Sequence, residues 1–347
     1  MDNLYGVKGF DCAIKTIEPQ IRKILSGLSD YEKSIIYEIR MRSQKPIVLN
    51  TYYGTKFLSA DSALSENLNE TSVKSTVEQV TETFSRLCCY SVHSHMSGIV
   101  KGYITTEGGH RAGITGTAVC DSKGNINSVK DISGINLRIS REVKGSADRI
   151  VDELYKNKLQ SIIIAGPPSS GKTTVLRDAV RQLSSGKRLY KIALIDERQE
   201  IASVNSGIAQ NDVGINCDVL DCYPKSEAMM IALKTLSPQI IALDEVAEEK
   251  EIAGVRLAVN SGVNFIVTVH AADYSELIRR PQIKRLIETY SFSKVVMLKK
   301  DPIGEIADIY DTKELKDEII RCSYDMDIFD SSGFEDVCFA EKTCTYT

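Results

Sequence analysis

The sequence predicts an α/β fold, in which a parallel β-sheet covered by helices on both faces follows a smaller α+β domain. Three observations predict it. From residue 150 to about 311, short apolar strands alternate with amphipathic helices. These strands are rich in Ile, Val and Leu, as are the strands of sheets buried on both faces. Before residue 149 the pattern is irregular and mostly β-like, with one clear helix.

Length and composition limit the number of domains, the kinds of partner and the cellular compartment of the protein. The 347 residues are enough for two domains, which we place at 1–148 and 149–311, with an acidic, flexible tail at 312–347. A net charge of −4 does not indicate a nucleic-acid binder, and nine cysteines without zinc-site spacing suit a reducing cytoplasm. No signal peptide is visible, and no apolar run approaches the ~20 residues that cross a bilayer. Membrane association therefore has to come through a partner or a surface contact.

Within the first domain, one strand and one helix stand out. Residues 37–42 alternate apolar and charged side chains, as a strand with one buried face does, and a turn follows at 44–46. The helix begins at residues 75–78, where Ser75 and Glu78 have the spacing of a capping box. Its apolar residues recur every three to four positions: Val73, Val77, Val80, Phe84 and Leu87. Residues 143–148 are the expected linker.

The second domain is expected to contain five buried strands and the helices between them. The strands are predicted at 161–165, 191–195, 239–243, 264–269 and 294–298. Helices are predicted at 174–183, 226–236 and 247–259. In a parallel sheet of this kind, functional residues gather at the carboxyl ends of the strands.

The segment from Gly166 to Thr173 matches the phosphate-binding loop G-x-x-x-x-G-K-[ST], and it lies between a predicted strand and a predicted helix. Its glycines let backbone N–H groups turn toward phosphates, and Lys172 adds a point charge at the β- and γ-phosphates. Thr173 would place its hydroxyl on Mg²⁺. We therefore predict that the chain binds ATP and Mg²⁺. The expected nucleotide contacts are Gly166, Pro167, Pro168, Ser169, Ser170, Gly171, Lys172, Thr173 and Thr174.

Three of the predicted strands end in a cluster with polar residues, at 196–200, 244–245 and 268–270. Asp244 and Glu245 come directly after four apolar residues, the arrangement called Walker B. Asp244 would hold Mg²⁺ through its water shell, and Glu245 would polarise the attacking water. His270 follows a neighbouring strand, where it is placed to sense the γ-phosphate.

The order of phosphate loop, acidic cluster, Walker B pair and histidine resembles the secretion ATPase superfamily, which drives type II and type IV secretion and pilus machines. It is more similar still to the stage III sporulation protein AA family of endospore-forming bacteria. The resemblance covers about residues 35–310 and implies a RecA-like P-loop ATPase core. The matching motifs lie at 38–42, 45–46, 108–113, 131–133, 137–142, 196–201, 212–214, 218–221, 224–229 and 237–238.

The resemblance implies a homo-oligomer, a hexamer, with nucleotide at the subunit interfaces. It implies ATP hydrolysis that energises or assembles a channel between mother cell and forespore, from the mother-cell cytoplasm. The implied partners are membrane-embedded channel proteins, which would hold the protein at the membrane around the forespore. Asp196 and Glu200 match the acidic-box carboxylates. Arg111, Arg138 and Arg141 are candidates to reach a neighbour's γ-phosphate, and the alternative is that they are surface arginines balancing nearby acids.

Other classes of function would leave different marks in the sequence. A DNA-handling RecA-fold ATPase would need a module of interleaved basic and aromatic residues, whereas the tail here is acidic. A nucleotide-gated scaffold with little hydrolysis is a further alternative, and retention of Lys172, Glu245 and His270 together argues against it. A GTPase would need a base-reading motif that no segment supplies. For the tail, solvated disorder and a docking peptide for a basic partner both stay open.

Overall fold

The computed structural model describes residues 2–141, 143–289 and 291–319 of the 347-residue chain. The chain divides into two compact units, Met1–Lys158 with Thr173–Asp244, and Leu159–Lys172 with Glu245–Thr347. One seven-stranded sheet precedes the predicted domain boundary at 148/149, and a second follows it. The boundary itself stays a prediction.

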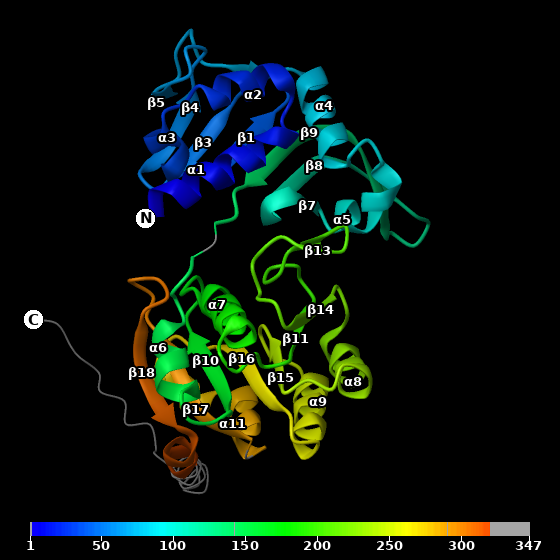
Figure 1. Ribbon diagram of the computed structural model, residues 1–347. Helices are drawn as coiled ribbons and strands as arrows, with labels where there is room; N and C mark the ends of the chain where they lie inside the picture. The colour runs from blue at the N-terminus through cyan, green and yellow to red at the C-terminus, as the bar shows by residue number, and fades with distance from the viewer. Residues whose placement is uncertain (1, 142, 290, 320–347) are drawn as a thin grey trace, which may run out of the picture. The chain divides into compact units, whose positions relative to one another are not determined.

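The first sheet has the strand order β5-β4-β3-β1-β9-β8-β7, and all its pairings are antiparallel (Figure 1). Its strands are β1 Ile36–Arg42, β3 Val48–Thr51, β4 Gly54–Leu58, β5 Leu64–Ser65, β7 Tyr103–Thr105, β8 Arg111–Cys120 and β9 Ile126–Arg138. β1 lies in the middle, where Ile39 pairs with Leu49 and Leu137. The strand predicted at 37–42 is therefore confirmed. Short pairs form between β2 Lys45–Pro46 and β6 Lys74–Ser75, and between β12 Val204–Asn205 and β13 Ile208–Ala209.

The prediction of one helix in this part of the chain is wrong. The helical segments before residue 110 are α1 Asp2–Ala13, η1 Ile14–Thr16, α2 Pro19–Ser26, α3 Asp30–Ile35, α4 Val77–Leu87, η2 Val92–His95, α5 Met96–Val100 and η3 Glu107–Gly109. Short helices gain most of their stability from tertiary packing, so their sequence signal is weak. Ile21 and Leu25 of α2, for example, are fully buried in the core of this sheet. The predicted helix is α4, but its capping box joins Thr76 and Gln79, one residue beyond the expected pair.

The second sheet has the order β14-β11-β15-β16-β10-β17-β18. Its strands are β10 Ser161–Gly166, β11 Ile192–Asp196, β14 Cys217–Asp221, β15 Ile240–Leu243, β16 Asn264–His270, β17 Phe292–Leu298 and β18 Ile306–Asp311. β10 runs parallel to β16 and β17, β11 runs parallel to β14 and β15, and β18 is antiparallel to β17. All five predicted strands are confirmed. β14 and β18 were missed because these edge strands carry carboxylates at intervals and lack an apolar run.

The helices of this part are α6 Asp148–Ile150, the π-helical turn η4 Val151–Tyr155, α7 Lys172–Ser185, α8 Lys225–Thr235, α9 Glu249–Asn260, α10 Tyr274–Arg279 and α11 Pro281–Glu288. α7, α8 and α9 confirm the three predicted helices. The apolar side chains along one face of α7 are buried: Val175, Leu176, Ala179, Val180 and Leu183. The sheet and its helices thus have the α/β architecture that the sequence predicts for this part of the chain.

We expected a flexible tail from residue 312 onward, but the first eight residues of this segment are ordered. Residues 312–319 are helical, and Thr312, Leu315 and Ile319 are buried. Three buried side chains at helical spacing hold this segment in place. The rest of the expected tail lies outside the described residues. Across the part of the chain that the structure describes, no helix is both long and apolar enough to cross a membrane.

Candidate functional site

The predicted phosphate loop joins β10 to α7, and its backbone is bent as such a loop requires. The φ angles of Ser169 and Gly171 are 61° and 87°, both in the left-handed region. Left-handed residues in a tight loop turn successive N–H groups to one side, which makes a site for an anion. A β-carbon on Gly171 would lie 3.0 Å from Cγ2 of Ile303 and 3.2 Å from the nitrogen of Gly304. Glycine is therefore needed at this position.

The side chains of this loop fit a phosphate group. The hydroxyl of Ser170 is fully buried and has no hydrogen-bond partner. Buried polar groups are almost always bonded, so an unpartnered hydroxyl inside the loop suits a polar ligand. The ammonium of Lys172 is buried as well and donates to the carbonyl oxygens of Gly166 at 2.9 Å and Pro167 at 2.8 Å. A cation is thus held against the loop.

Lys172, the first residue of α7, meets His270 at the carboxyl end of β16. His270 ends β16 and pairs with Gly166 across the sheet. Its Nδ1 lies 3.2 Å from the Nζ of Lys172, and its Nε2 lies 3.4 Å from Oε1 of Glu245. An ammonium group can only donate, so Nδ1 accepts and the ring proton lies on Nε2, toward Glu245. Lys172, His270 and Glu245 therefore form one connected polar chain.

The backbone of Glu245 is held in an unusual conformation. Its φ angle is 51°, a left-handed value that is uncommon for a residue other than glycine. The backbone N–H of Glu245 donates to the hydroxyl of Thr268 at 2.8 Å, and the N–H of Val246 donates to the carbonyl oxygen of Thr268 at 3.0 Å. Strain of this kind persists only where neighbours fix it, and it gathers at functional sites. Thr268 thus fixes the backbone of Glu245.

Thr173 and Asp244 form the oxygen pair that was predicted to hold Mg²⁺. The hydroxyl of Thr173 donates to Oδ2 of Asp244 at 2.7 Å. Mg²⁺ prefers oxygen ligands and is commonly held by few protein groups, with water and phosphate oxygens completing its shell. Among the described residues no cluster of three or more metal-binding side chains occurs. A hydroxyl and one carboxylate therefore fit a Mg²⁺ ion that arrives with a phosphate ligand.

Asp196 is the last residue of β11, and its carboxylate accepts hydrogen bonds from the backbone of the loop that follows. It is 2% exposed and accepts hydrogen bonds from the N–H groups of residues 200, 201, 202 and 203 at 2.8–3.2 Å. Burial raises the pKa of the Asp196 carboxyl, although these four bonds lower it. The structure thus gives Asp196 a positioning role for the acidic cluster, and its predicted role as an acidic-box carboxylate of an ATPase stays a prediction.

Glu200, by contrast, pairs with Arg111 and lines the same cavity as Arg138. The guanidinium of Arg111 donates to Oε1 of Glu200 at 2.9 Å and stacks 3.6 Å from the centre of the Tyr103 ring. Arg111, Arg138 and Glu200 line one cavity of about 280 Å³. This grouping of two guanidinium groups and a carboxylate lies within the first unit. The third candidate, Arg141, instead donates to the carbonyl oxygen of Ile36 at 2.7 Å and so serves the fold of that unit.

Two contacts of the site were not predicted from the sequence. Thr268 was noted only as part of a polar cluster, although it fixes the backbone of Glu245. The loop between β17 and β18 packs on the phosphate loop, where the N–H of Gly304 donates to the carbonyl oxygen of Ser170 at 2.9 Å. No sequence signal marks a contact between segments more than 130 residues apart.

Comparisons with known proteins agree with this geometry. A family described as Sporulation stage III, protein AA matches residues 12–316. The stage III sporulation protein AA of Bacillus subtilis (strain 168) is 33% identical over 302 residues, which cover 86% of this chain and 94% of that protein. The solved structure of the pilus retraction motor PilT with bound ADP matches with a TM-score of 0.59 at 14% identity, covering 89% of each chain. The Yersinia pseudotuberculosis ATPase DotB matches with a TM-score of 0.50 at 15% identity, covering 83% of this chain and 79% of that one. At these identities, the structural likeness shows the fold.

Proposed function

The chain belongs to the sporulation stage III protein AA family, and on that premise we propose that it hydrolyses ATP to energise or assemble a channel between mother cell and forespore. The family and the secretion-ATPase fold support an ATPase-like role. ATP with Mg²⁺ is the proposed substrate. The proposed site consists of the phosphate loop from Gly166 to Thr174, with Asp244, Glu245 and His270.

The observation that carries the proposal is the polar chain from Lys172 through His270 to Glu245. It links the cation of the phosphate loop to the carboxylate that would act on water, through an imidazole within 3.4 Å of both. A nucleotide-gated scaffold binds ATP without hydrolysing it, so it would not need a carboxylate oriented to act on water. Phosphoryl transfer asks the protein mainly for positioning and electrostatic stabilisation, and these residues are placed for both.

Each residue of this chain has a distinct task in the proposed reaction. Lys172 offsets the negative charge that builds up on the transferring phosphoryl group. Glu245 orients the attacking water and accepts its proton, and His270 fixes the Glu245 carboxylate through the proton on Nε2. Thr173 and Asp244 would hold Mg²⁺, which would supply positive charge to the phosphate oxygens. Hydrolysis therefore depends on Glu245, whereas binding depends on Lys172.

We further propose that the protein acts as a homo-oligomer, a hexamer, in which Arg111 and Arg138 act on nucleotide held by a neighbouring copy. Both arginines line one cavity together with Glu200, which accepts a hydrogen bond from Arg111. Stabilising the charge on a phosphoryl group is the usual work of arginines supplied by a second subunit. The grouping of two arginines at one cavity supports this assignment.

The proposed partners are membrane-embedded channel proteins, and the proposed place of action is the mother-cell side of the membrane around the forespore. In sporulating cells a fluorescently tagged protein should collect at that membrane. A strain carrying Lys172→Ala should complete engulfment and then stall. Diffuse signal at all stages, together with normal spore yield from the Lys172→Ala strain, would remove the sporulation role and leave an ATPase of other purpose.

The enzymatic part is tested with purified protein. ATP hydrolysis should be measured as a function of protein concentration, with and without the cytoplasmic segments of the membrane partners. Turnover that rises with protein concentration supports a shared active site. ATP binding without any turnover, in all mixtures, would favour the nucleotide-gated scaffold instead.

A further inference from the structure

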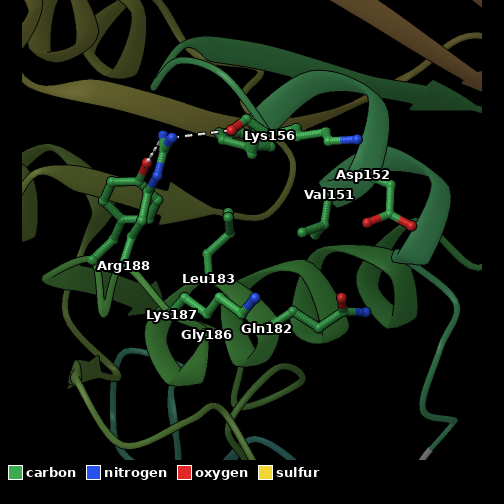
Figure 2. A pocket seen from close by; sticks show the side chains of 10 residues that line it. Val151, Asp152, Lys156, Gln182, Leu183, Gly186, Lys187 and Arg188 are labelled. Atoms are coloured by element: carbon green, nitrogen blue, oxygen red, sulfur yellow. Dashed lines mark hydrogen bonds between the residues drawn. The ribbon is translucent and has the colours of Figure 1, made fainter.

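A second cavity lies at the far end of α7 from the phosphate loop. It has a volume of about 390 Å³, within the range of small-molecule sites. It lies between the π-helical turn η4, the last turns of α7 and the segment that follows α7 (Figure 2). Thr173 and Leu183 are about 15 Å apart along α7 at 1.5 Å per residue. The cavity is therefore separate from the proposed nucleotide site.

The inner wall of this cavity is apolar and aromatic. Val151 and Leu183 contribute aliphatic side chains, which Figure 2 shows facing the same hollow, and Tyr155 and Tyr190 also line it. Leu183, Tyr155 and Tyr190 are all buried. Ligand sites combine such a wall with a small number of placed polar groups. This wall suits a flat apolar body.

The hydroxyl of Tyr155 is the first placed polar group. The side chain is 3% exposed, and its hydroxyl has no hydrogen-bond partner. Buried hydroxyls are nearly always bonded, and leaving one unbonded is unfavourable. The residue belongs to η4, and π-helical turns occur frequently at functional sites. An acceptor atom of a ligand would satisfy this hydroxyl.

The rim of the cavity is positively charged. Lys156, Lys187 and Arg188 line it, against the single carboxylate of Asp152, which makes three cations to one anion. Arg188 is fixed in place because it donates to the hydroxyl of Tyr190 at 3.0 Å and to the carbonyl oxygen of Lys156 at 3.0 Å, as the dashed lines in Figure 2 show. A guanidinium has five N–H donors, so this fixed group can also donate to an anion.

From these features we propose that the cavity is a binding site for a small ligand that joins a flat apolar body to one phosphate or carboxylate group. The apolar body packs against Val151, Leu183 and the tyrosine rings. An acceptor atom bonds the Tyr155 hydroxyl, and the anionic group meets Arg188 and Lys187. The site is independent of the proposed ATP site.

The test uses 1-naphthyl phosphate as the probe, with 1-naphthol and inorganic phosphate as separate arms, in isothermal titration calorimetry on the full chain. Only the probe has both the apolar body and the anion, so it should bind at least about tenfold more tightly than either part. A fourth titration with 1-naphthoate shows whether the site prefers a phosphate or a carboxylate group. Binding should persist in Lys172→Ala, which places the probe outside the phosphate loop.

Two variants locate the site. Lys187→Gln combined with Arg188→Gln should weaken probe binding at least about tenfold, since charged hydrogen bonds are lost. The matched control is Lys158→Gln with Lys191→Gln, which removes the same charge from exposed lysines that do not line the cavity. Tyr155→Phe should weaken binding about fivefold, while the melting temperature of the unliganded variant does not fall, because no existing bond is removed.

Three results would overturn the proposal. The first is probe binding no tighter than that of inorganic phosphate. The second is equal weakening by the paired substitutions and by their control. The third is binding that disappears in Lys172→Ala but survives the paired substitutions at Lys187 and Arg188.

Discussion

The Nδ1 of His270 lies 3.2 Å from the Nζ of Lys172, which joins the end of β16 to the phosphate loop. This contact fixes the imidazole so that its other nitrogen faces Glu245 at 3.4 Å. The strand pairing of Gly166 with His270 sets the distance, since it places the two strand ends side by side. His270 therefore contacts both the phosphate loop and Glu245, which supports the proposal that it acts in the site.

His270→Ala should slow ATP hydrolysis about 100-fold, because Glu245 loses the group that orients it. ATP binding should change little, since Lys172 and the loop remain. Steady-state turnover and titration with a fluorescent ATP analogue measure the two effects. The control is His93→Ala, which removes an exposed histidine. Unchanged turnover in His270→Ala would show that the contact is structural only.

Asp196→Asn should destabilise the fold by about 2 kcal/mol, because an amide offers one acceptor oxygen where the carboxylate serves four N–H groups. Denaturant unfolding of the two proteins measures the change. The control, Asp218→Asn, alters an exposed carboxylate on β14 and should stay within about 0.5 kcal/mol of the wild type. Equal stability of Asp196→Asn and the wild type would contradict the positioning role.

His110 should make the fold sensitive to acid. Burial lowers the pKa of His110 to about 4, although the nearby Glu107 charge raises it. Its folded-state pKa lies below its unfolded value of about 6.5, so the stability is present above pH 6.5 and is lost as the pH falls toward 4. The loss should be about 3 kcal/mol. Nδ1 accepts from the N–H of Ser140 at 3.0 Å, a bond that Asn can imitate.

Denaturant midpoints of the wild type and His110→Asn, measured between pH 7 and pH 4, test this assignment. The wild type should lose more stability over that range, because the variant has no imidazole to protonate. His93→Asn, which changes an exposed histidine, serves as the control. Parallel curves for the wild type and His110→Asn would mean that another group governs the acid response.

Arg111→Ala and Arg138→Ala should lose hydrolysis while still binding ATP. If these arginines act on a neighbour's nucleotide, mixing either variant with Lys172→Ala should restore part of the activity. A mixed interface then pairs an intact phosphate loop with intact arginines. Specific activity of the wild type should also rise with protein concentration. No rescue, with activity independent of concentration, would exclude action between subunits.

The sequence predicted the core of this fold well because buried parallel strands and amphipathic helices leave clear patterns. All five predicted strands and all three predicted helices of the second domain are present. The short helices α2 and α3 and the edge strands β14 and β18 were missed, because packing by distant residues stabilises them. The same reason explains which contacts of the candidate site were predicted and which were missed. Lys172, Glu245 and His270 follow from motif and strand order, whereas the role of Thr268 and the contact of Gly304 depend on three-dimensional proximity.

The central claim is that Glu245 serves hydrolysis and Lys172 serves binding, and it is tested by measuring ATP affinity and single-turnover hydrolysis in Glu245→Gln and Lys172→Ala. Glu245→Gln keeps the shape of the side chain and loses the carboxylate, so it should bind ATP as the wild type does and hydrolyse it at least about 100-fold more slowly. Lys172→Ala should fail to bind. Wild-type turnover by Glu245→Gln would contradict the account.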